Sequence, residues 1–516
     1  MQEIKLSNTI IAKNTMFLYL RMVFVLVVTL YTSRIVLHEL GVVDFGIYTL
    51  VAGFVLMFSF FGSSLSNAAQ RFLNYQYGLG NERGANNVFN MGFVNFFLLS
   101  IIVVIALETF GLWFLNNKLI IPTQRLQIVN NVFHFSVISV FVTMNSYIYR
   151  AVLIARENMA IYAYTGIFEA IARLAIAYMI INTAIDKLML YSFMYMLVSI
   201  LVCFVYMIYC FKYYDECKFN LHWDYSLFKE MFSFIGWNAF TSLIEAINQQ
   251  GISITLNLFF GPIVNAARGI AFQINNALLS FSHNIYMAAR PQIVKAYAVK
   301  DMEFFLKTIN LSSRFTYYLL LIFAIPLILN IDYILYIWLK DVPKFTSIFS
   351  VLIIAYTLVD SLKNPLWAAA QAVGDLKRYS LLGGAIFLLN FPISYLLMYL
   401  GFHPKWVYVV YVLIRIGYLI SIIFVIKRLV KEFDLRNYFN LVISPIILVT
   451  VLAPIIPFLL TLIIIEENLI SLILISISSF ISSLIVIFFF GLDSIERFKI
   501  RVLVLNKLNL NNKNEE

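Results

Sequence analysis

Twelve charged side chains lie inside the long apolar stretches of this sequence, where a charge is costly. A lysine, arginine or aspartate at membrane depth costs about 2.5 to 3.5 kcal/mol on insertion scales, so each is a candidate for function. Eight are basic and four are acidic: Arg21, Arg34, Arg173, Arg268, Lys307, Arg314, Lys363 and Arg415, with Glu108, Glu169, Glu245 and Asp360. Because bases exceed acids by four, we expect a hydrated cationic cavity suited to phosphate, whose oxygens match guanidinium donors.

Depth and spacing separate these candidates. Glu169 and Arg173 are four residues apart on one predicted helix face, so a structural ion pair and a cavity role are both open for Arg173. Arg34 and Arg268 lie near the predicted outer ends of their spans and could extend to the interface, whereas Arg415 lies near mid-depth. Three further bases could extend to the cytoplasmic interface: Arg21, Lys307 and Arg314. We expect four arginines to contact the substrate: Arg34, Arg173, Arg268 and Arg415.

A polar run interrupts the seventh predicted span. It comprises Glu245, Asn248, Gln249 and Gln250. Four polar side chains facing lipid would be hard to offset, so we expect this run to line the cavity. The three acidic candidates for a coupling proton or sodium ion are Glu169, Glu245 and Asp360. Asp360 also lies three residues from Lys363, which could neutralise it locally.

No pattern in the sequence is typical of an enzyme or a metal site. Cys203, Cys210 and Cys217 have neither Cys-x-x-Cys nor Cys/His ligand spacing, and the HELGV at His38 is not the His-Glu-x-x-His zinc pattern. A Walker A glycine-rich loop is also missing from the sequence. We therefore expect no catalytic residue, no metal and no cofactor apart from a coupling proton or sodium ion.

Composition places these residues in a membrane protein. Of 516 residues, 62% are hydrophobic and 12% are charged, whereas soluble domains are about half apolar and a quarter charged. Apolar stretches of twenty or more residues recur, which is the length a helix needs to cross a hydrocarbon core of about 30 Å. The expected fold class is an all-α polytopic membrane protein of about fourteen transmembrane helices.

The predicted spans fix an orientation. They cover residues 14–38, 45–70, 88–115, 126–155, 160–182, 188–211, 231–260, 263–290, 303–329, 345–371, 379–400, 405–425, 438–465 and 469–490. Among the loops, 23 lysines and arginines lie on the side of the termini and six on the opposite side. Positive residues favour the cytoplasm, so we expect both termini there. The net charge of +10 is explained by this bias and needs no nucleic acid partner.

An internal repeat appears at a shift of about 220 residues. NAAQRFLNYQYGLGNERGANNVFN from Asn67 lies without gaps over MAARPQIVKAYAVKDMEFFLKTIN from Met287, and Gly41 falls on Gly261. The repeat predicts two pseudo-symmetric six-helix bundles, 1–212 and 231–432, joined by a cytoplasmic linker, 213–230. Residues 433–516 would add two transmembrane helices and a cytoplasmic tail. Paired bundles of this kind place the substrate between the halves and work by alternating access.

The segment NTMFLYLRMVFVLVVTLYTSRIVLHELGVVDFGIYTLVAGFVLMFSFFGSSLSNAAQRFLNYQYG, which begins at Asn14, resembles the opening of known transporters. These are polysaccharide transporters of the multidrug/oligosaccharidyl-lipid/polysaccharide (MOP) exporter superfamily, which is MATE-like, and especially the Wzx-type O-antigen flippases. The likeness is densest over residues 14–90, and the span count and repeat extend it over nearly the whole chain. It assigns no particular arginine.

The resemblance implies a flippase of the bacterial inner membrane that is not an enzyme. The substrate would be an oligosaccharide repeat unit of O-antigen, lipopolysaccharide or capsule on undecaprenyl diphosphate, moved from the cytoplasmic to the periplasmic leaflet. Partners would be membrane lipid, a polysaccharide polymerase and chain-length proteins. Two alternatives stay open: a multidrug exporter of the same superfamily, which a basic cavity disfavours, and a membrane-embedded glycan polymerase or glycosyltransferase, which the short external loops disfavour.

Overall fold

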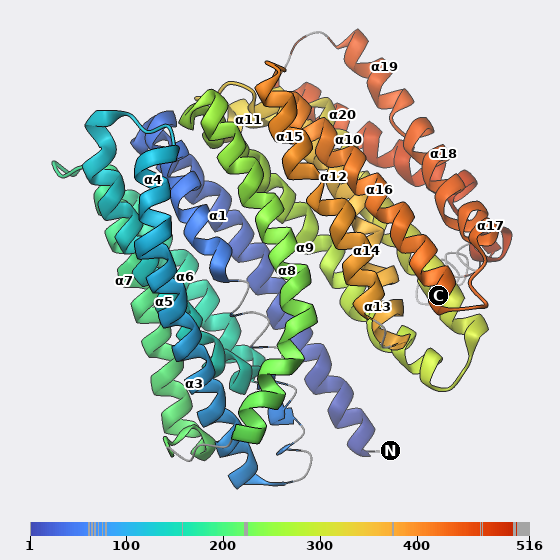
Figure 1. The fold of residues 1–516 in the computed structure, drawn as a ribbon. Helices are drawn as coiled ribbons and strands as arrows, with labels where there is room; N and C mark the ends of the chain where they lie inside the picture. The colour runs from blue at the N-terminus through green and yellow to red at the C-terminus, as the bar shows by residue number, and fades with distance from the viewer. Residues whose placement is uncertain are drawn as a thin grey trace, which may run out of the picture. The chain divides into compact units, whose positions relative to one another are not determined.

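The computed structural model describes residues 2–59, 80–156, 158–220, 225–373, 376–464 and 468–498, with shorter pieces between 62 and 77 and the single residues 466 and 502. Every regular element in these ranges is helical (Figure 1). Contacts divide the chain into two compact units, which we call unit 1 and unit 2. Unit 1 holds residues 1–273, 341–346 and 387–407, and unit 2 holds 274–340, 347–386 and 408–516. The predicted domain boundaries stay predictions.

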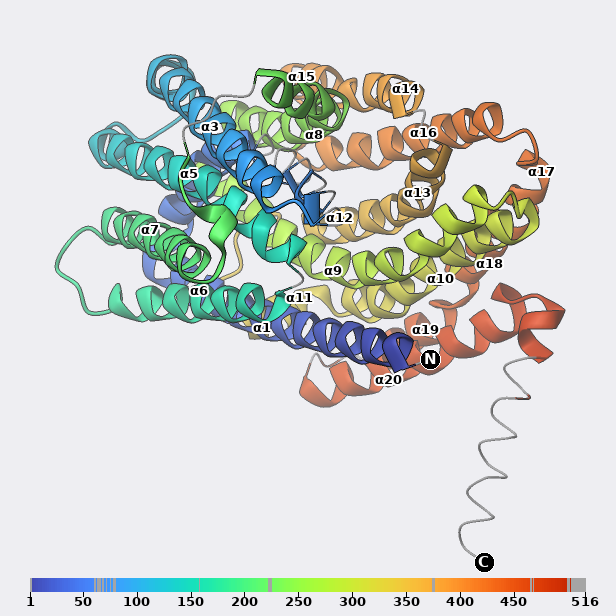
Figure 2. The same ribbon diagram turned by 90° about the horizontal axis from the view of Figure 1, so that it is seen from below.

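Unit 1 contains the helices of the first half and one short later helix. They are α1 (Gln2–Leu56), α3 (Glu82–Ala106), α4 (Leu112–Lys118), α5 (Leu126–Ala155), α6 (Met159–Met179), α7 (Lys187–Tyr213), α8 (Tyr225–Phe260), the start of α9 (Pro262–Ala298) and α15 (Asn390–Tyr399). Within it α5 packs on α7 and α3, and α1 packs on α6 (Figure 2). The buried residues of α5 recur every three or four positions, as in Val129, Val132, Phe133, Val140 and Met144, which gives one apolar stripe toward the neighbours.

Unit 2 contains the remaining helices. They are the rest of α9, α10 (Met302–Leu329), α11 (Ile331–Leu339), most of α12 (Thr346–Ser361), α13 (Lys363–Val373), most of α14 (Leu376–Leu388), most of α16 (Lys405–Leu429), α17 (Leu435–Tyr438), α18 (Ser444–Leu452), α19 (Ile455–Ile463) and α20 (Leu469–Val486). α10 packs on α20 and α18. The Tyr317 hydroxyl lies 3.0 Å from that of Thr450, and the Tyr318 hydroxyl donates to the Gly491 carbonyl at 3.1 Å. These bonds attach the two last membrane segments to α10.

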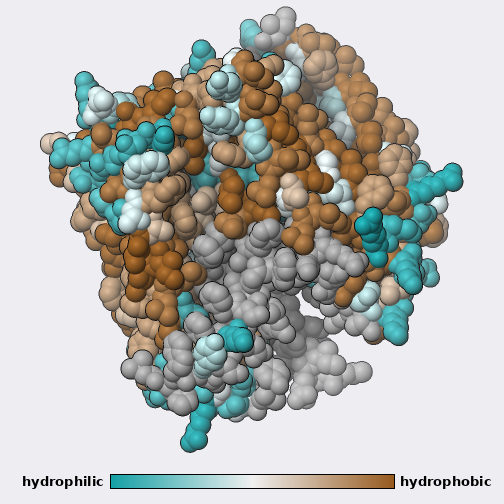
Figure 3. All heavy atoms as spheres, viewed as in Figure 1, coloured by the Kyte–Doolittle hydropathy of each residue, from teal (hydrophilic) through white to brown (hydrophobic). Residues whose placement is uncertain are grey.

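Eleven helical segments of the described chain are long and apolar enough to cross a membrane. They match the predicted spans, except that the first, Arg21–Leu56, runs through the first predicted connection. The seventh and eighth predicted spans fall on α8 and α9, whose side chains the structure describes only in part. In Figure 3 apolar side chains cover the flanks of the helices, and hydrophilic ones gather near their ends. The chain is an all-α, multi-pass membrane protein, as its composition predicts.

Two glycines break long helices at positions that correspond in the predicted repeat. Gly41 has φ of 73° inside α1, and Gly261 has φ of 76° where α8 ends and α9 begins. A side chain at such a backbone angle would be strained, so glycine suits both positions. The break at Gly41 separates the first two predicted spans without an intervening loop.

A second pair of turns repeats in greater detail. Gly80 and Lys300, 220 residues apart, have φ of 64° and 60°. Their amides donate to Tyr77 and Tyr297 at 3.1 Å in both cases. Each turn is followed by an N-cap whose side chain accepts from the amide three residues on: Asn81 for α3 and Asp301 for α10. The matching turns support the predicted repeat.

Clusters of charge tie together the ends of unit 1. At one end Arg125 pairs with Asp44 and Asp186, and Lys187 donates to Glu39 at 2.6 Å. At the other end, Glu216 accepts from Arg156 at 2.8 Å and from the Tyr77 hydroxyl at 2.7 Å. The second cluster closes the segment after α7 against α3 and α5, because Asn86 donates to the backbone carbonyls of Glu216 and Lys218. These clusters hold fixed the helices that form the cavity described next.

Candidate functional site

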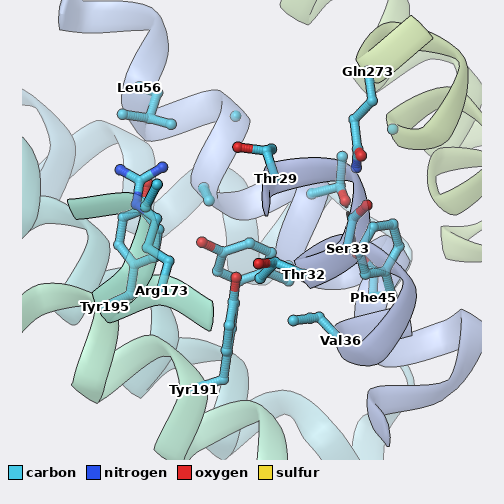
Figure 4. Close-up of a pocket in the computed structure, with 16 residues that line it drawn as sticks. Thr29, Thr32, Ser33, Val36, Phe45, Leu56, Arg173, Tyr191, Tyr195 and Gln273 are labelled. Carbon is cyan, nitrogen blue, oxygen red and sulfur yellow. Dashed lines mark hydrogen bonds between the residues drawn. The ribbon is translucent and has the colours of Figure 1, made fainter. Parts of the chain in front are cut away.

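Unit 1 contains an open cavity of about 380 Å³, which we call the unit 1 cavity (Figure 4). Its volume lies within the range of about 300 to 1,000 Å³ typical of ligand pockets. Sixteen residues from α1, α6, α7 and α9 line it: Thr29, Thr32, Ser33, Val36, Phe45, Tyr48, Thr49, Ala52, Gly53, Leu56, Ala170, Arg173, Tyr191, Tyr195, Gly269 and Gln273. All of these helices except α9 contain candidate membrane spans, so this cavity, whose mainly apolar lining also carries hydroxyl, amide and guanidinium groups, lies inside a membrane protein.

Small hydroxyl residues on α1 form one wall. Thr32 donates to the Val28 carbonyl at 2.7 Å, and Ser33 donates to the Leu30 carbonyl at 2.8 Å. Thr49 makes the same kind of bond beyond the break at Gly41. Because each hydroxyl proton is used within its own helix, each oxygen keeps lone pairs that can accept from a ligand. This wall is therefore a row of hydrogen-bond acceptors.

Three tyrosines form the opposite side. Tyr191 and Tyr195 are four residues apart on α7, so they share a face of that helix. The ring of Tyr48, from α1, meets the Tyr191 ring edge to face at 4.9 Å between centroids and lies 6.4 Å from the Tyr195 ring. Such edge-to-face contacts stabilise aromatic pairs and fix their ring planes. The cavity thus has rigid aromatic surfaces with hydroxyl groups at their tips.

Arg173 supplies the charge on the lining, and Glu169 compensates it. The two side chains form an ion pair four residues apart on α6, with 36% of the Arg173 side chain and 28% of the Glu169 side chain exposed. The guanidinium also lies over the Tyr195 ring, 4.4 Å from its centroid, where the ring's electron density attracts it. Its Nε atom is buried and makes no hydrogen bond to the described residues. Arg173 therefore brings a guanidinium to the lining without adding net charge.

A smaller hollow of about 20 Å³ adjoins this aromatic side. It shares Tyr48 and Tyr195 with the unit 1 cavity and adds Ser136, Ser139 and Ser192 from α5 and α7. The serines donate to carbonyls in their own helices, so their oxygens also remain acceptors. A space of this size holds about one water molecule.

The other predicted residues of unit 1 lie outside this lining. Arg268 on α9 is buried, donates to the backbone carbonyl of Gln249 and stacks on Phe272 at 4.1 Å. Arg34 follows Ser33 on α1, is partly exposed and forms no ion pair with a described residue.

The polar run on α8 is only partly described. Asn248 is buried and donates to the Ile244 carbonyl at 3.2 Å. The side chain of Gln250 comes within about 3 Å of the space above Gly53, at the edge of the unit 1 cavity. Glu245 is within α8, but its side chain lies outside the described residues.

Unit 2 contains the remaining predicted residues in a second cluster. Arg415 on α16 forms an ion pair with Asp360 on α12, and Lys363 lies 3.7 Å from the same carboxylate. The Arg415 guanidinium lies 5.2 Å from the centroid of the Tyr356 ring and 4.8 Å from that of Tyr418. Each unit thus holds a guanidinium that is paired with a carboxylate and packed on tyrosine.

The tyrosines are the site residues that sequence reasoning did not single out. We expected cavity tyrosines in general to stack on sugar rings, but 31 tyrosines in an apolar chain give no reason to prefer one. The useful signal is the spacing of Tyr191 and Tyr195 on one helix. This spacing indicates a site only once the structure shows that Arg173, on α6, packs against the same face of α7.

Comparisons with known proteins identify the fold. No protein-family profile and no curated protein sequence matches the chain. Among solved structures, an inward-facing multidrug resistance MATE family transporter of the MOP superfamily matches with TM-score 0.62 and 13% identity, over 81% of this chain and 96% of that one. The lipid II flippase MurJ, in an inward closed conformation, matches with TM-score 0.65 and 12% identity, over 92% of this chain and 98% of that one.

A third solved structure adds a transporter whose pocket differs from its relatives. It is a MOP superfamily transporter from Pyrococcus furiosus, described as having a binding pocket of reverse polarity, and it matches with TM-score 0.56 and 13% identity over 81% of this chain and 96% of that one. Identities this low carry the fold and not the substrate. The chain therefore has the fold found in MATE transporters and in the MurJ flippase.

Proposed function

We propose that this protein is a flippase of the polysaccharide transporter branch of the MOP superfamily. It would carry an oligosaccharide repeat unit on undecaprenyl diphosphate from the cytoplasmic to the periplasmic leaflet of a bacterial inner membrane, by alternating access. The observation that carries the proposal is the unit 1 cavity, whose lining combines hydroxyl groups, tyrosines and an arginine that is paired with a carboxylate. The fold likeness to MurJ, a lipid II flippase, supports a lipid-linked substrate.

The physical reason is the cost of moving a glycan through hydrocarbon. Each hydroxyl group transferred into an apolar medium without a partner costs several kcal/mol. A row of hydroxyl acceptors on α1, with the guanidinium donors of Arg173 opposite, would replace the hydrogen bonds that the glycan makes with water. The lipid tail needs no such replacement and can stay in the bilayer.

The diphosphate requires an uncompensated cation. Glu169 and Asp360 already neutralise Arg173 and Arg415, and Arg268 is buried against a backbone carbonyl. Arg34 is partly exposed and has no carboxylate partner among the described residues, so we assign it the main diphosphate contact. Glu169, Glu245 and Asp360 remain the proposed sites for a coupling proton or sodium ion.

A complementation experiment tests the proposal. In a strain lacking this gene, surface polysaccharide should disappear and its lipid-linked repeat unit should accumulate on the cytoplasmic leaflet. The wild-type gene should restore the polysaccharide, and Arg34→Ala should not, at equal protein level in the membrane. Arg428→Ala serves as the matched control, because Arg428 lies in the last turn of α16 and is not among the residues that line the unit 1 cavity. Normal polysaccharide in the deletion strain contradicts the proposal.

A multidrug exporter is the second candidate, and the MATE structures that match the fold favour it. Tyrosine rings can bind an aromatic cation, but such a ligand would also need a free carboxylate, and Arg173 compensates Glu169. Susceptibility of the deletion strain to cationic drugs tests this candidate. Increased susceptibility with unchanged polysaccharide would favour it. A polysaccharide polymerase and chain-length proteins would be downstream partners only under the flippase proposal.

A further inference from the structure

We infer that the unit 1 cavity binds an uncharged sugar ring of the substrate, and that the diphosphate binds elsewhere. The inference rests on the proposed function and assigns different parts of the substrate to different residues. It departs from the expectation that Arg173 contacts phosphate.

The charge of the cavity is the first argument. Arg173 is the charged residue among the sixteen described lining residues, and its ion pair with Glu169 leaves no net charge. A diphosphate on Arg173 would approach the Glu169 carboxylate, which repels it, or would have to displace that carboxylate. An uncharged ligand leaves the pair between Arg173 and Glu169 intact.

The second argument is the match between the lining and a pyranose. A sugar ring has apolar C–H faces and hydroxyl groups around its edge. The rings of Tyr191 and Tyr195 provide apolar faces on one side, and the oxygens of Thr32 and Ser33 accept from hydroxyl groups on the other. Gln273 can both donate and accept, and its side chain points toward Ser33 in Figure 4.

The third argument is rigidity. The Tyr48, Tyr191 and Tyr195 rings contact one another, with centroids 4.9 to 6.4 Å apart. Arg173 is held by Glu169 and by the Tyr195 ring together. Side chains locked in this way lose little entropy when a ligand binds, so they can discriminate between sugars of similar size.

Binding of two matched probes tests the inference. Purified protein in phosphatidylglycerol nanodiscs would be titrated with a panel of octyl glycosides, comprising the glucoside, galactoside, mannoside and N-acetylglucosaminide, and with octyl phosphate. We expect at least one glycoside to raise the melting temperature of the wild type. Tyr195→Ala and Ala170→Leu, which fills the cavity, should each weaken the binding of that glycoside at least tenfold. Arg34→Ala should weaken the binding of octyl phosphate, and Tyr195→Ala should leave it unchanged.

Two further variants sharpen the result. Tyr206→Phe is the matched control, because Tyr206 lies on the same helix as Tyr195 and also stacks with an arginine, Arg150 at 5.1 Å, but is outside the lining. It should bind the glycoside as the wild type does. Glu169→Gln should gain binding of octyl phosphate at least tenfold, because Arg173 would then be uncompensated.

Three results would contradict a sugar site in the unit 1 cavity. No glycoside of the panel binds, Tyr195→Ala abolishes the binding of octyl phosphate, or cells with Ala170→Leu make normal surface polysaccharide. The last outcome leaves the flippase proposal standing, because that proposal fails only if the deletion strain itself makes normal polysaccharide. Melting of each variant without ligand shows whether it is folded, and Ala170→Leu carries the test if Tyr195→Ala is not folded.

Discussion

The guanidinium of Arg415 forms an ion pair with the carboxylate of Asp360 within unit 2, and both side chains are less than a tenth exposed. The two residues are far apart in the sequence and join α16 to α12. In a buried pair of this kind, the attraction between the charges offsets their loss of hydration. A single buried charge has no such compensation. Neither α12 nor α16 can therefore move away from the other without leaving a buried charge unpaired.

Removing one member of this pair should destabilise the protein strongly. We expect Asp360→Ala to lower the free energy of unfolding by about 3 to 5 kcal/mol, because Arg415 would be left buried without its carboxylate. The double variant Asp360→Leu with Arg415→Met should recover most of that loss. Lys363→Met is the matched control, since Lys363 is 3.7 Å from Asp360 and more exposed, and it should cost less than about 1 kcal/mol. Denaturant unfolding in detergent measures all three, and equal effects of Asp360→Ala and Lys363→Met would contradict the argument.

The cluster around Glu216 predicts a dependence of stability on pH. Burial raises the pKa of Glu216, but the hydrogen bonds from Arg156 and Tyr77 outweigh it, so the pKa lies below its ordinary value of 4.5. Since the folded state has the lower pKa, the stabilisation is fully present above pH 4.5 and is lost as the pH falls through the lowered value. The melting temperatures of wild type and Glu216→Gln should differ by several degrees at pH 7 and converge toward pH 3. A constant difference between pH 7 and pH 3 would show that the charge of Glu216 does not stabilise the fold.

Sequence reasoning succeeded where the physics is local. Helices follow from apolar runs that must satisfy their own backbone in lipid, and the pairing of Glu169 with Arg173 follows from their spacing of four residues. The glycine break at residue 41 and its repeat at residue 261 could likewise be read from the chain.

Contacts between distant residues could not be predicted in the same way. Asp360 was expected to pair with Lys363, three residues away, but its shorter contact is with Arg415 on another helix. Tyr48 meets Tyr191 only because α1 and α7 come together in unit 1, and no local pattern distinguishes either from the other tyrosines. The repeat gives the order of the helices but not which side chains meet between them.

The repeated turns predict opposite effects of exchanging their central residues. Lys300 has φ of 60°, which strains any residue with a side chain, whereas its counterpart Gly80 has φ of 64° without strain. Lys300→Gly should therefore stabilise the protein by up to about 1 kcal/mol, and Gly80→Ala should destabilise it by about 1 kcal/mol. Thermal melts in detergent compare the two. A stabilising Gly80→Ala would show that the turn at residue 80 does not keep its backbone angle in solution.

The attachment of α20 to α10 can be tested through Arg314. This guanidinium is buried, donates to the Gly491 carbonyl at 3.2 Å and pairs with Glu496 just beyond α20. Glu496→Ala should cost about 1.5 to 3 kcal/mol, because a hydrogen bond between charged groups is lost at a buried site. Hydrogen exchange should then rise at the end of α20 while that of α5 in unit 1 stays unchanged. Arg497→Ala is the neighbouring control, since the hydrogen bonds of Arg497 within the described residues are two long ones to carbonyls, each of 3.4 Å. If Glu496→Ala and Arg497→Ala show the same hydrogen exchange at the end of α20, the Arg314–Glu496 pair does not hold the last helix in place.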